Sequence, residues 1–364
     1  MFSSVDYIHM SHALQLAHKG LYSTSPNPRV GCVITQHDKM IASGWHERTG
    51  QPHAEINALN SAIEDVRGAT AYITLEPCSH HGHTPPCTDA LIRAGVGKVI
   101  IAMQDPNPKV SGQGIAQLQQ AGITVESGLL ETEAQQLNPG FISRMTRKKS
   151  WVRLKIAASL DGKTALNNGQ SQWITGEAAQ RDGHRWRARS CAVLTGIGTL
   201  MQDDPKLTVR HVTTSRQPKK IVIDKELDIP LDAKLLQGEE VLIFTTNAKK
   251  IEKITALNVL GAHVIVSPDM GGNVDLVGMM HKLAELEINE LLVEAGSGIN
   301  GALINAGLVD ELVLFLAPHL LGDIAQGMSK LPELTGLDQK HLLDIHDVRM
   351  IGRDIRVIAR CHKP

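Results

Sequence analysis

Short apolar runs separated by helical segments are the feature of this chain that most restricts its fold. The runs AYITL (71–75) and KVIIAM (98–103) are almost continuously apolar, which is typical of strands buried on both faces of a sheet. Residues 4–19 have apolar side chains at helical spacing, and strands are predicted at 30–34 and 39–43. The N-terminal part is therefore predicted to be an α/β sheet layered with helices.

A stretch with Pro, Gly and several basic residues, near 139–150, is predicted to be a linker between domains. A new strand is predicted at 151–159. Further strand-like runs follow, with helical segments between several of them, at 191–195, 220–223, 241–245, 262–266, 290–293 and 312–317. The sequence of 364 residues therefore predicts two α/β domains, 1–147 and 148–364.

Charge and composition exclude several classes of protein. The chain has 37 Lys and Arg residues against 38 Asp and Glu residues, a net charge of −1, which disfavours nucleic-acid binding. Aromatic residues make up only 3%, so a platform for stacking bases is not expected. The sequence has no run of about 20 apolar residues and no signal-peptide core, so we expect no membrane span. Five cysteines, an odd number, fit a reducing cytoplasm better than a disulfide framework.

Two strings combine zinc-binding residue types with a residue type that transfers protons. PHAEINAL places His53 and Glu55 at the start of a predicted helix, and LEPCSHHGHTPPC contains Cys78 and Cys87. One imidazole and two thiolates supply three ligands of tetrahedral zinc, and an open fourth position is typical of catalytic sites. A carboxylate two residues from the histidine can move protons between zinc-bound water and a substrate. H-x-E followed by P-C is typical of zinc deaminases, although eight residues separate these cysteines instead of two.

A closed structural zinc site is the alternative, with a fourth ligand from His80, His81 or His83. Such a site has no need for Glu55, which favours the catalytic interpretation. Three further cysteines lie in apolar, strand-like segments and are predicted to pack in the core: Cys32, Cys191 and Cys361.

The C-terminal part contains the glycine-rich string GSGING (296–301) between a predicted strand and a predicted helix. Its backbone N–H groups can approach a phosphate, although packing glycines in a tight turn are the alternative. The string lies late in its domain and no acidic residue follows about 20 residues later, so a standard Rossmann unit is not indicated. Arg187 and Arg210 are candidates for binding a phosphate, with solvated surface arginines as the alternative.

The N-terminal half resembles the cytidine deaminase superfamily and, more narrowly, the deaminase domain of the bifunctional riboflavin-biosynthesis family RibD. The matching strings are TSPNPRVGCVI, GWHERTGQPHAE, TLEPCSHHGHTPPC and DPNPKVSGQGI. The resemblance implies a three-layer cytidine-deaminase-like domain in which His53, Cys78 and Cys87 bind zinc and Glu55 transfers protons. It also implies substrate contacts from three residues, of which the last would bind the phosphate: Asn27, His46 and His80.

The C-terminal half resembles the RibD reductase domain, whose fold is similar to dihydrofolate reductase, in the strings SLDGKTA, SQWIT, GTLMQDDPKLTVR and VEAGSGING. The resemblance implies NADPH contacts from Ala157, Trp173, Thr199, Asp203, Gly296, Ser297, Gly298, Ile299, Asn300, Gly301 and Ala302. It implies substrate contacts from Ser171, Arg187, Leu207, Arg210 and Glu294. The chain departs from the family pattern at His83, Lys225, Ala295 and His319.

The resemblance implies two successive steps on a phosphorylated pyrimidine. The first is zinc-dependent deamination of 2,5-diamino-6-(5-phosphoribosylamino)pyrimidin-4(3H)-one, and the second is NADPH-dependent reduction to 5-amino-6-(5-phosphoribitylamino)uracil. We expect a cytoplasmic homo-oligomer whose partners are small molecules. Only Asp203, by its placement, is a candidate general acid for the reduction. The alternatives are a nucleic-acid deaminase, a zinc-structural protein, and a single-function zinc deaminase with a non-catalytic C-terminal ligand-binding module.

Overall fold

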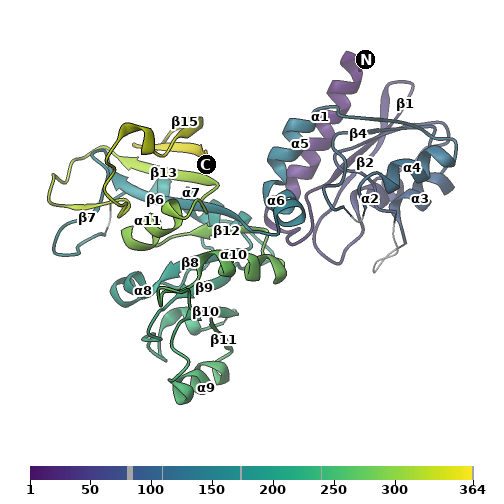
Figure 1. The fold of residues 1–364 in the computed structure, drawn as a ribbon. Coiled ribbons are helices and arrows are strands. Elements are labelled where there is room, and N and C mark those ends of the chain that lie inside the picture. Colours follow the sequence, from purple (N-terminus) through teal and green to yellow (C-terminus); the bar gives the residue numbers. More distant parts are fainter. Residues whose placement is uncertain (80–84, 109, 173, 239, 363–364) are drawn as a thin grey trace. The chain divides into compact units, whose positions relative to one another are not determined.

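The computed structural model divides the chain into two compact units, Met1–Lys148 and Lys149–Pro364, each described here by itself (Figure 1). Two residues predicted at the sites, His80 and Trp173, lie outside the described residues. Among the described residues, no helix is long and apolar enough to cross a membrane. The structure describes residues 1–79, 85–108, 110–172, 174–238 and 240–362.

The first unit is a five-stranded sheet with helices on both faces. The strands are β1 (Gly31–Gln36), β2 (Lys39–Trp45), β3 (Thr70–Ile73), β4 (Lys98–Ile101) and β5 (Thr124–Ser127). The helices are α1 (Ser4–Lys19), the 3-10 turn η1 (Gly20–Tyr22), α2 (Ala54–Ser61), α3 (Cys87–Arg93), α4 (Gln113–Gln120), α5 (Glu131–Leu137) and α6 (Pro139–Arg147). The strand order is β2-β1-β3-β4-β5; β1 is antiparallel to both of its neighbours, and β3, β4 and β5 run parallel.

Alternate residues of the central strands face two different helical layers. Val33 and Tyr72 pack in a core with α1, α5 and α6, whereas Cys32 and Ile73 pack in a second core with α2, α3 and α4. Side chains of a strand point alternately to its two faces, so each strand contributes to both cores. The resulting order of helices, sheet and helices is visible in Figure 1 and confirms the predicted three-layer domain.

The predicted linker at 139–150 is wrong over most of its length, because residues 139–147 form α6. Pro139 occupies the first helical turn, where its missing N–H would have no helical partner in any case. Phe141 and Ile142 pack against the core that contains α1. Lys148 takes the left-handed conformation that ends the helix, so the joint between the units is shorter than the composition suggested.

The second unit is built on a nine-stranded sheet. Its strands are β6 (Trp151–Ser159), β8 (Ala192–Gly196), β9 (Lys219–Ile223), β10 (Val241–Thr245), β11 (Ala262–Val266), β12 (Glu290–Val293), β13 (Glu311–Ala317), β15 (Leu343–Ile351) and β16 (Asp354–Cys361), and a separate two-stranded ribbon contains β7 (Lys163–Ala165) and β14 (Gln326–Gly327). The helices are α7 (Glu177–Arg189), α8 (Ile197–Asp203), α9 (Ile251–Val259), α10 (Leu276–Glu285) and α11 (Ser297–Asn305), with 3-10 turns η2 (Lys234–Leu236) and η3 (Leu337–Gln339).

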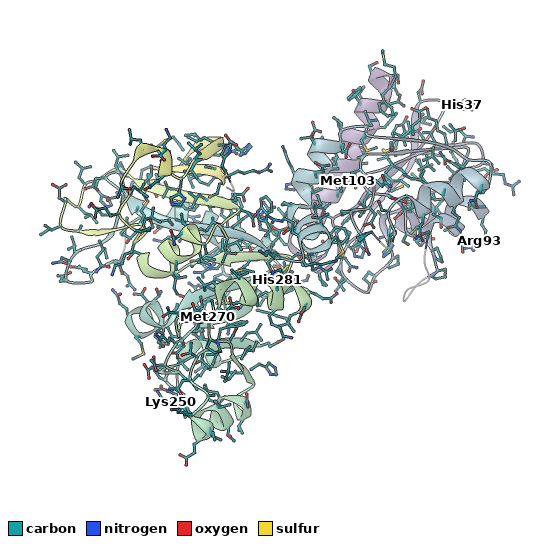
Figure 2. All side chains as sticks on the ribbon, viewed as in Figure 1. His37, Arg93, Met103, Lys250, Met270 and His281 are labelled. Atoms are coloured by element: carbon teal, nitrogen blue, oxygen red, sulfur yellow. The ribbon has the colours of Figure 1, made fainter. Side chains whose placement is uncertain are left out.

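The nine strands follow the order β11-β10-β9-β8-β12-β6-β13-β16-β15, parallel from β11 to β13 and antiparallel beyond. Val193 and Leu292 pack with Trp186 of α7, and their strand neighbours face α10 and α11. This confirms the predicted α/β unit. Figure 2 labels side chains of both units. Met103 is buried in the core of the first unit, and Met270 and His281 are exposed in the second.

Candidate active sites

Three potential metal ligands converge in the first unit. His53, Cys78 and Cys87 are the one such group found among the described residues, and their ligand atoms all lie within 4.8 Å of one another. His53 Nδ1 is 3.6 Å from Cys78 Sγ and 3.3 Å from Cys87 Sγ. With Zn–S near 2.3 Å and Zn–N near 2.0 Å, a tetrahedral site has a nitrogen–sulfur distance of about 3.5 Å. The donor set and its spacing therefore fit zinc.

The three ligands come from the starts of two helices and from the loop after β3. His53 is the residue immediately before α2, and Cys87 is the first residue of α3. The backbone N–H of Thr88 donates to the carbonyl oxygen of Cys78 (3.2 Å), and the N–H of Cys87 donates to Cys78 Sγ (3.3 Å). Helix N-termini carry partial positive charge, so the sulfur atoms lie where negative charge is favoured.

The two thiols differ in acidity. A hydrogen bond with Cys87 is the largest of the effects that lower the pKa of Cys78. The same hydrogen bond raises the pKa of Cys87. A divalent cation bound between the two sulfurs deprotonates both, because a coordinated thiol is held as thiolate.

Glu55 is buried beside these ligands, with 3% of its surface exposed. It lies in the first turn of α2, two residues after His53. Burial raises the pKa of its carboxyl to about 7, against the opposing effect of His53. A carboxyl group with that pKa can take up and release a proton near neutral pH, which is the requirement for a general acid and base.

Asn27 and His46, both predicted from the sequence, lie together next to the ligands. The rings of His46 and His53 meet edge to face with centroids 5.4 Å apart. His46 Nδ1 lies 3.1 Å from the carbonyl oxygen of Pro52, which can only accept, so Nδ1 carries the proton. His46 Nε2 then accepts from the Asn27 amide at 3.1 Å. Burial lowers the pKa of His46, which keeps this neutral tautomer.

Glu76 was not predicted from the sequence. It is close in sequence to Cys78, and its carboxylate binds the backbone of the loop that connects β4 to α4 and of the start of α4. It is 3% exposed, and its two oxygens accept four backbone N–H groups: from Asp105 (3.0 Å), Gly112 (3.0 Å), Gly114 (2.9 Å) and Ile115 (3.3 Å). A side chain at Gly114 would place its Cβ 2.2 Å from the carbonyl oxygen of Pro77, so only glycine fits there. One carboxylate therefore fixes both ends of the loop and the start of α4.

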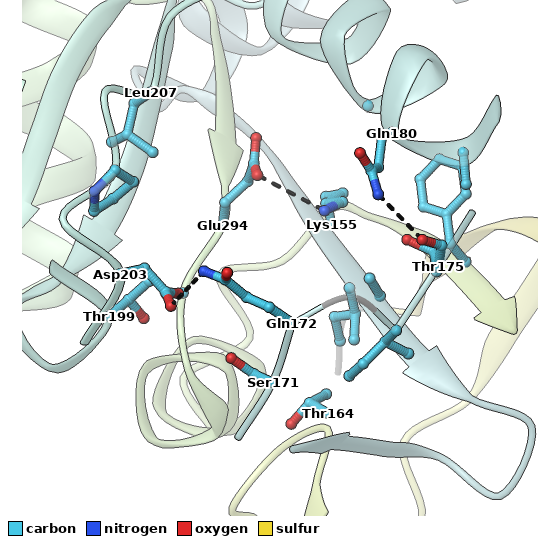
Figure 3. Close-up of a pocket in the computed structure, with 18 of the residues that line it drawn as sticks. Lys155, Thr164, Ser171, Gln172, Thr175, Gln180, Thr199, Asp203, Leu207 and Glu294 are labelled. Carbon is cyan, nitrogen blue, oxygen red and sulfur yellow. Dashed lines mark hydrogen bonds and ion pairs between the residues drawn. The ribbon is translucent and has the colours of Figure 1, made fainter. Parts of the chain in front are cut away.

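The second unit contains a cavity of about 930 Å³ at the C-terminal ends of β6, β8 and β12. Ligands bind at this edge in open α/β sheets. Figure 3 shows Lys155 of β6 and Glu294, which follows β12, pointing toward one another in the cavity. Eleven of the residues predicted from the sequence line it: Ala157, Ser171, Arg187, Thr199, Asp203, Leu207, Arg210, Glu294, Gly296, Ser297 and Asn300.

Glu294 is the centre of an ion-pair cluster in this cavity. Arg187 binds it with two hydrogen bonds (2.6 and 3.0 Å), and the Lys155 ammonium is 3.7 Å away. Although burial opposes the charged form, Arg187 and Lys155 lower the pKa of Glu294 to about 2. Arg187 also donates to the carbonyl oxygen of Thr208 (3.1 Å), so its guanidinium is held in place before any ligand arrives.

The remaining loop residues predicted to contact NADPH do not line the cavity: Gly298, Ile299, Gly301 and Ala302. Gly301 is in close contact with the backbone, because a Cβ there would lie 2.0 Å from the carbonyl oxygen of Lys330. Asn300 donates through Nδ2 to the carbonyl oxygen of Met328 (2.9 Å), and its buried Oδ1 has no partner among the described residues. Asn300 is also one of the residues that line the cavity.

Several pocket residues were absent from the prediction: Lys155, Gln172 and His184. Gln172 donates to Asp203 Oδ1 at 3.3 Å (Figure 3). For Lys155 a signal was available, because it is the one charged residue in the otherwise apolar run 154–158. His184 and Gln172 have no such signal.

Two family models match the chain. The model of the cytidine and deoxycytidylate deaminase zinc-binding region matches residues 3–103, and the model of the RibD C-terminal domain matches residues 150–357. The first match contains all three converging ligands, and the second contains the residues that line the cavity. These matches confirm the predicted fold classes of the two units.

Relatives match over nearly the whole chain. The riboflavin biosynthesis protein RibD of Escherichia coli K12 is 45% identical, with 96% of this chain and 98% of that protein covered. The solved structure of Acinetobacter baumannii RibD (form 1) has a TM-score of 0.91 and 41% identity, covering 98% and 99%. That of a diaminohydroxyphosphoribosylaminopyrimidine deaminase/5-amino-6-(5-phosphoribosylamino)uracil reductase from Thermotoga maritima has a TM-score of 0.87 and 33% identity, with the same coverage.

Proposed function

The chain belongs to the RibD family, and from this membership we propose how its residues carry out the two activities. It is a bifunctional enzyme of riboflavin biosynthesis, a zinc-dependent deaminase and an NADPH-dependent reductase. We assign deamination to residues 1–147 and reduction to residues 148–364. The match to the RibD C-terminal domain argues against a non-catalytic second unit.

For the deaminase we propose 2,5-diamino-6-(5-phosphoribosylamino)pyrimidin-4(3H)-one as the substrate, as the name of the Thermotoga maritima relative suggests. His53, Cys78 and Cys87 would hold the zinc ion, which when bound lowers the pKa of a coordinated water to about 7. Glu55 would take a proton from the attacking water and deliver it to the departing 2-amino nitrogen. Its burial beside His53 excludes bulk water from this proton transfer.

The substrate pocket of the deaminase would be lined by Asn27 and His46. Because His46 accepts from the Asn27 amide nitrogen, the Asn27 carbonyl oxygen is left to accept a hydrogen bond from a ligand. An acceptor of this kind suits the amino and ring N–H groups of a diaminopyrimidine. His80 keeps the phosphate-binding role that the family resemblance gives it.

For the reductase we propose 5-amino-6-(5-phosphoribosylamino)uracil as substrate and 5-amino-6-(5-phosphoribitylamino)uracil as product. NADPH supplies the hydride when bound. We assign its contacts to the loop 296–302 and to Ala157, Trp173, Thr199 and Asp203. We assign the substrate contacts to Ser171, Arg187, Leu207, Arg210 and Glu294. The ion pair of Arg187 with Glu294 would hold these groups in position for the open sugar chain.

We further propose that the enzyme is a cytoplasmic homo-oligomer that binds neither nucleic acid nor membranes. A reducing compartment suits the five free cysteines, two of which are the proposed zinc ligands. The net charge of −1 supports the absence of nucleic-acid binding.

The convergence of His53, Cys78 and Cys87 around a buried Glu55 is the observation that carries the proposal. Purified protein incubated with the diaminopyrimidine phosphate should release ammonia without NADPH, and it should then consume NADPH when the cofactor is added. Glu55→Gln should retain zinc and lower ammonia release by about 10²- to 10⁴-fold, since a positioned acid and base contributes about that much. When the deaminated product is supplied separately, Glu55→Gln should reduce it at the same rate as the wild type.

The matched control is Glu64→Gln, an exposed glutamate of the same unit. It should leave zinc content and both activities as in the wild type. Full ammonia release by Glu55→Gln would refute the assignment of Glu55. Full zinc occupancy together with a fourth protein ligand would refute the catalytic site as a whole.

A further inference from the structure

His184 is a buried histidine of the reductase cavity for which the function proposed above has no role. It lies on α7, one turn before Arg187, and lines the cavity with 7% of its surface exposed. Its ring meets that of His211 edge to face, with centroids 5.3 Å apart. A polar side chain this deeply buried normally has hydrogen-bond partners on each side.

The hydrogen bonds of His184 fix its tautomer. The backbone N–H of Arg210 donates to Nδ1 at 3.1 Å, so Nδ1 carries no proton. The proton of the neutral ring is therefore on Nε2, at the opposite edge of the imidazole. Among the residues that the structure describes, Nε2 has no hydrogen-bond partner. The ring thus carries one donor that no described residue uses, on a side chain that lines the cavity.

The surroundings keep this ring neutral and attract anions. Burial, with the charges of Arg187 and Arg210, lowers the pKa of His184 to about 4, so the tautomer with a proton on Nε2 persists at neutral pH. Glu294 acts in the opposite direction, but Arg187 already pairs with it. Among the described residues, the Arg210 guanidinium makes one long contact, to the Thr208 hydroxyl (3.5 Å), so its charge remains available to a ligand.

We propose that His184 is a specificity-determining residue of the reductase that donates a hydrogen bond from Nε2 to the phosphate of the substrate. This inference rests on the proposed reductase function and adds a contact that the sequence did not indicate. The phosphate would lie between the His184 donor and the Arg210 guanidinium. The phosphate is remote from the carbon that receives hydride, so the contact acts on substrate binding rather than on the chemical step.

Two substitutions test the two ring nitrogens of His184 one at a time. In His184→Gln the side-chain amide nitrogen reaches approximately the position of Nε2 and keeps the donor toward the cavity. In His184→Asn the amide oxygen takes approximately the position of Nδ1 and keeps only the bond from Arg210. We expect His184→Asn to lower kcat/KM by about 10- to 100-fold, mainly through KM, since a hydrogen bond to a charged group has about that effect. His184→Gln should stay within about threefold of the wild type.

The experiment measures kcat and KM of the full-length holoenzyme for two substrates. These are 5-amino-6-(5-phosphoribosylamino)uracil and its phosphate-free counterpart. The loss in His184→Asn should appear with the phosphorylated substrate and fall to less than about threefold with the phosphate-free one. His346→Asn, an exposed histidine on β15, is the matched control and should behave as the wild type. Circular dichroism and urea unfolding monitor the folding of the second unit in every variant, and ammonia release by the first unit serves as the measure of enzyme concentration.

A loss in His184→Gln as large as that in His184→Asn would overturn the proposal, and so would wild-type behaviour of His184→Asn. An equal loss with both substrates would also overturn it, because the contact would then not be with the phosphate. A wild-type enzyme that does not reduce the phosphorylated substrate would instead refute the proposed reductase function.

Discussion

Replacing Glu76 by glutamine tests whether one buried carboxylate holds the deaminase unit together. The carboxylate accepts four backbone N–H groups, two on each oxygen. A glutamine keeps one oxygen acceptor, while its NH₂ group faces the other two donors. Each hydrogen bond to a charged group is worth about 1.5–3 kcal/mol, so the loss of two predicts about 3–6 kcal/mol of unfolding free energy. This is a large part of the stability of a typical domain.

The assay is urea unfolding of the full-length protein, with deaminase and reductase activities measured in the same samples. With a slope of about 1–3 kcal/mol per molar urea, the midpoint for deaminase activity should fall by at least about 1 M, while that for reductase activity stays unchanged. Glu126→Gln is the matched control. It removes a half-exposed surface pair with Lys98 (2.9 Å) and should cost no more than about 1 kcal/mol. Equal shifts in the two variants, or a shift of the reductase midpoint, would refute the reasoning.

Two further substitutions test the second unit. In Glu294→Gln the buried Arg187 loses its partner, which should cost about 3–5 kcal/mol at neutral pH. Because the folded-state pKa of Glu294 is about 2 and its ordinary value is 4.5, this contribution is complete above about pH 4.5 and is lost as the pH falls toward 2. The urea midpoints of the two proteins, followed by circular dichroism, should therefore converge in acid, and a constant difference would contradict the ion-pair explanation. In Gly301→Ala the new methyl group would lie 2.0 Å from the carbonyl oxygen of Lys330, so overpacking should cost about 1–3 kcal/mol and raise the KM for NADPH. Thermal unfolding and steady-state kinetics measure both effects, and unchanged values would show that the backbone moves away freely.

Strands with strong local signals were predicted within a few residues. The run 151–159 is one example, since its bounds are those of β6. The strands β15 and β16 were missed, because β15 is largely exposed and carries charged residues between its apolar ones. The strand β16 pairs with β13, which joins segments more than 30 residues apart, and no local pattern indicates such a contact. Within the described part of the chain, the strand β15 pairs only with β16, its neighbour in the sequence.

The convergence of His53, Cys78 and Cys87 could be predicted from the sequence because the ligand types and the H-x-E spacing are themselves the signal. The contribution of Glu76 could not, because its four partners are backbone groups, which every residue has. His184 was missed for a related reason, since its role depends on a bond from the Arg210 backbone across a loop. Composition also misled at α6, where basic residues and Pro suggested a linker although Phe141 and Ile142 pack in the core.

The apolar interiors of the two units are built from separate parts of the chain. Each hydrophobic cluster takes its buried side chains either from before residue 148 or from after it. A break in the gene at this point would therefore divide the chain without separating the residues of any of these clusters. In evolutionary terms, a recombination event at this joint would leave each of these clusters with all of its buried residues.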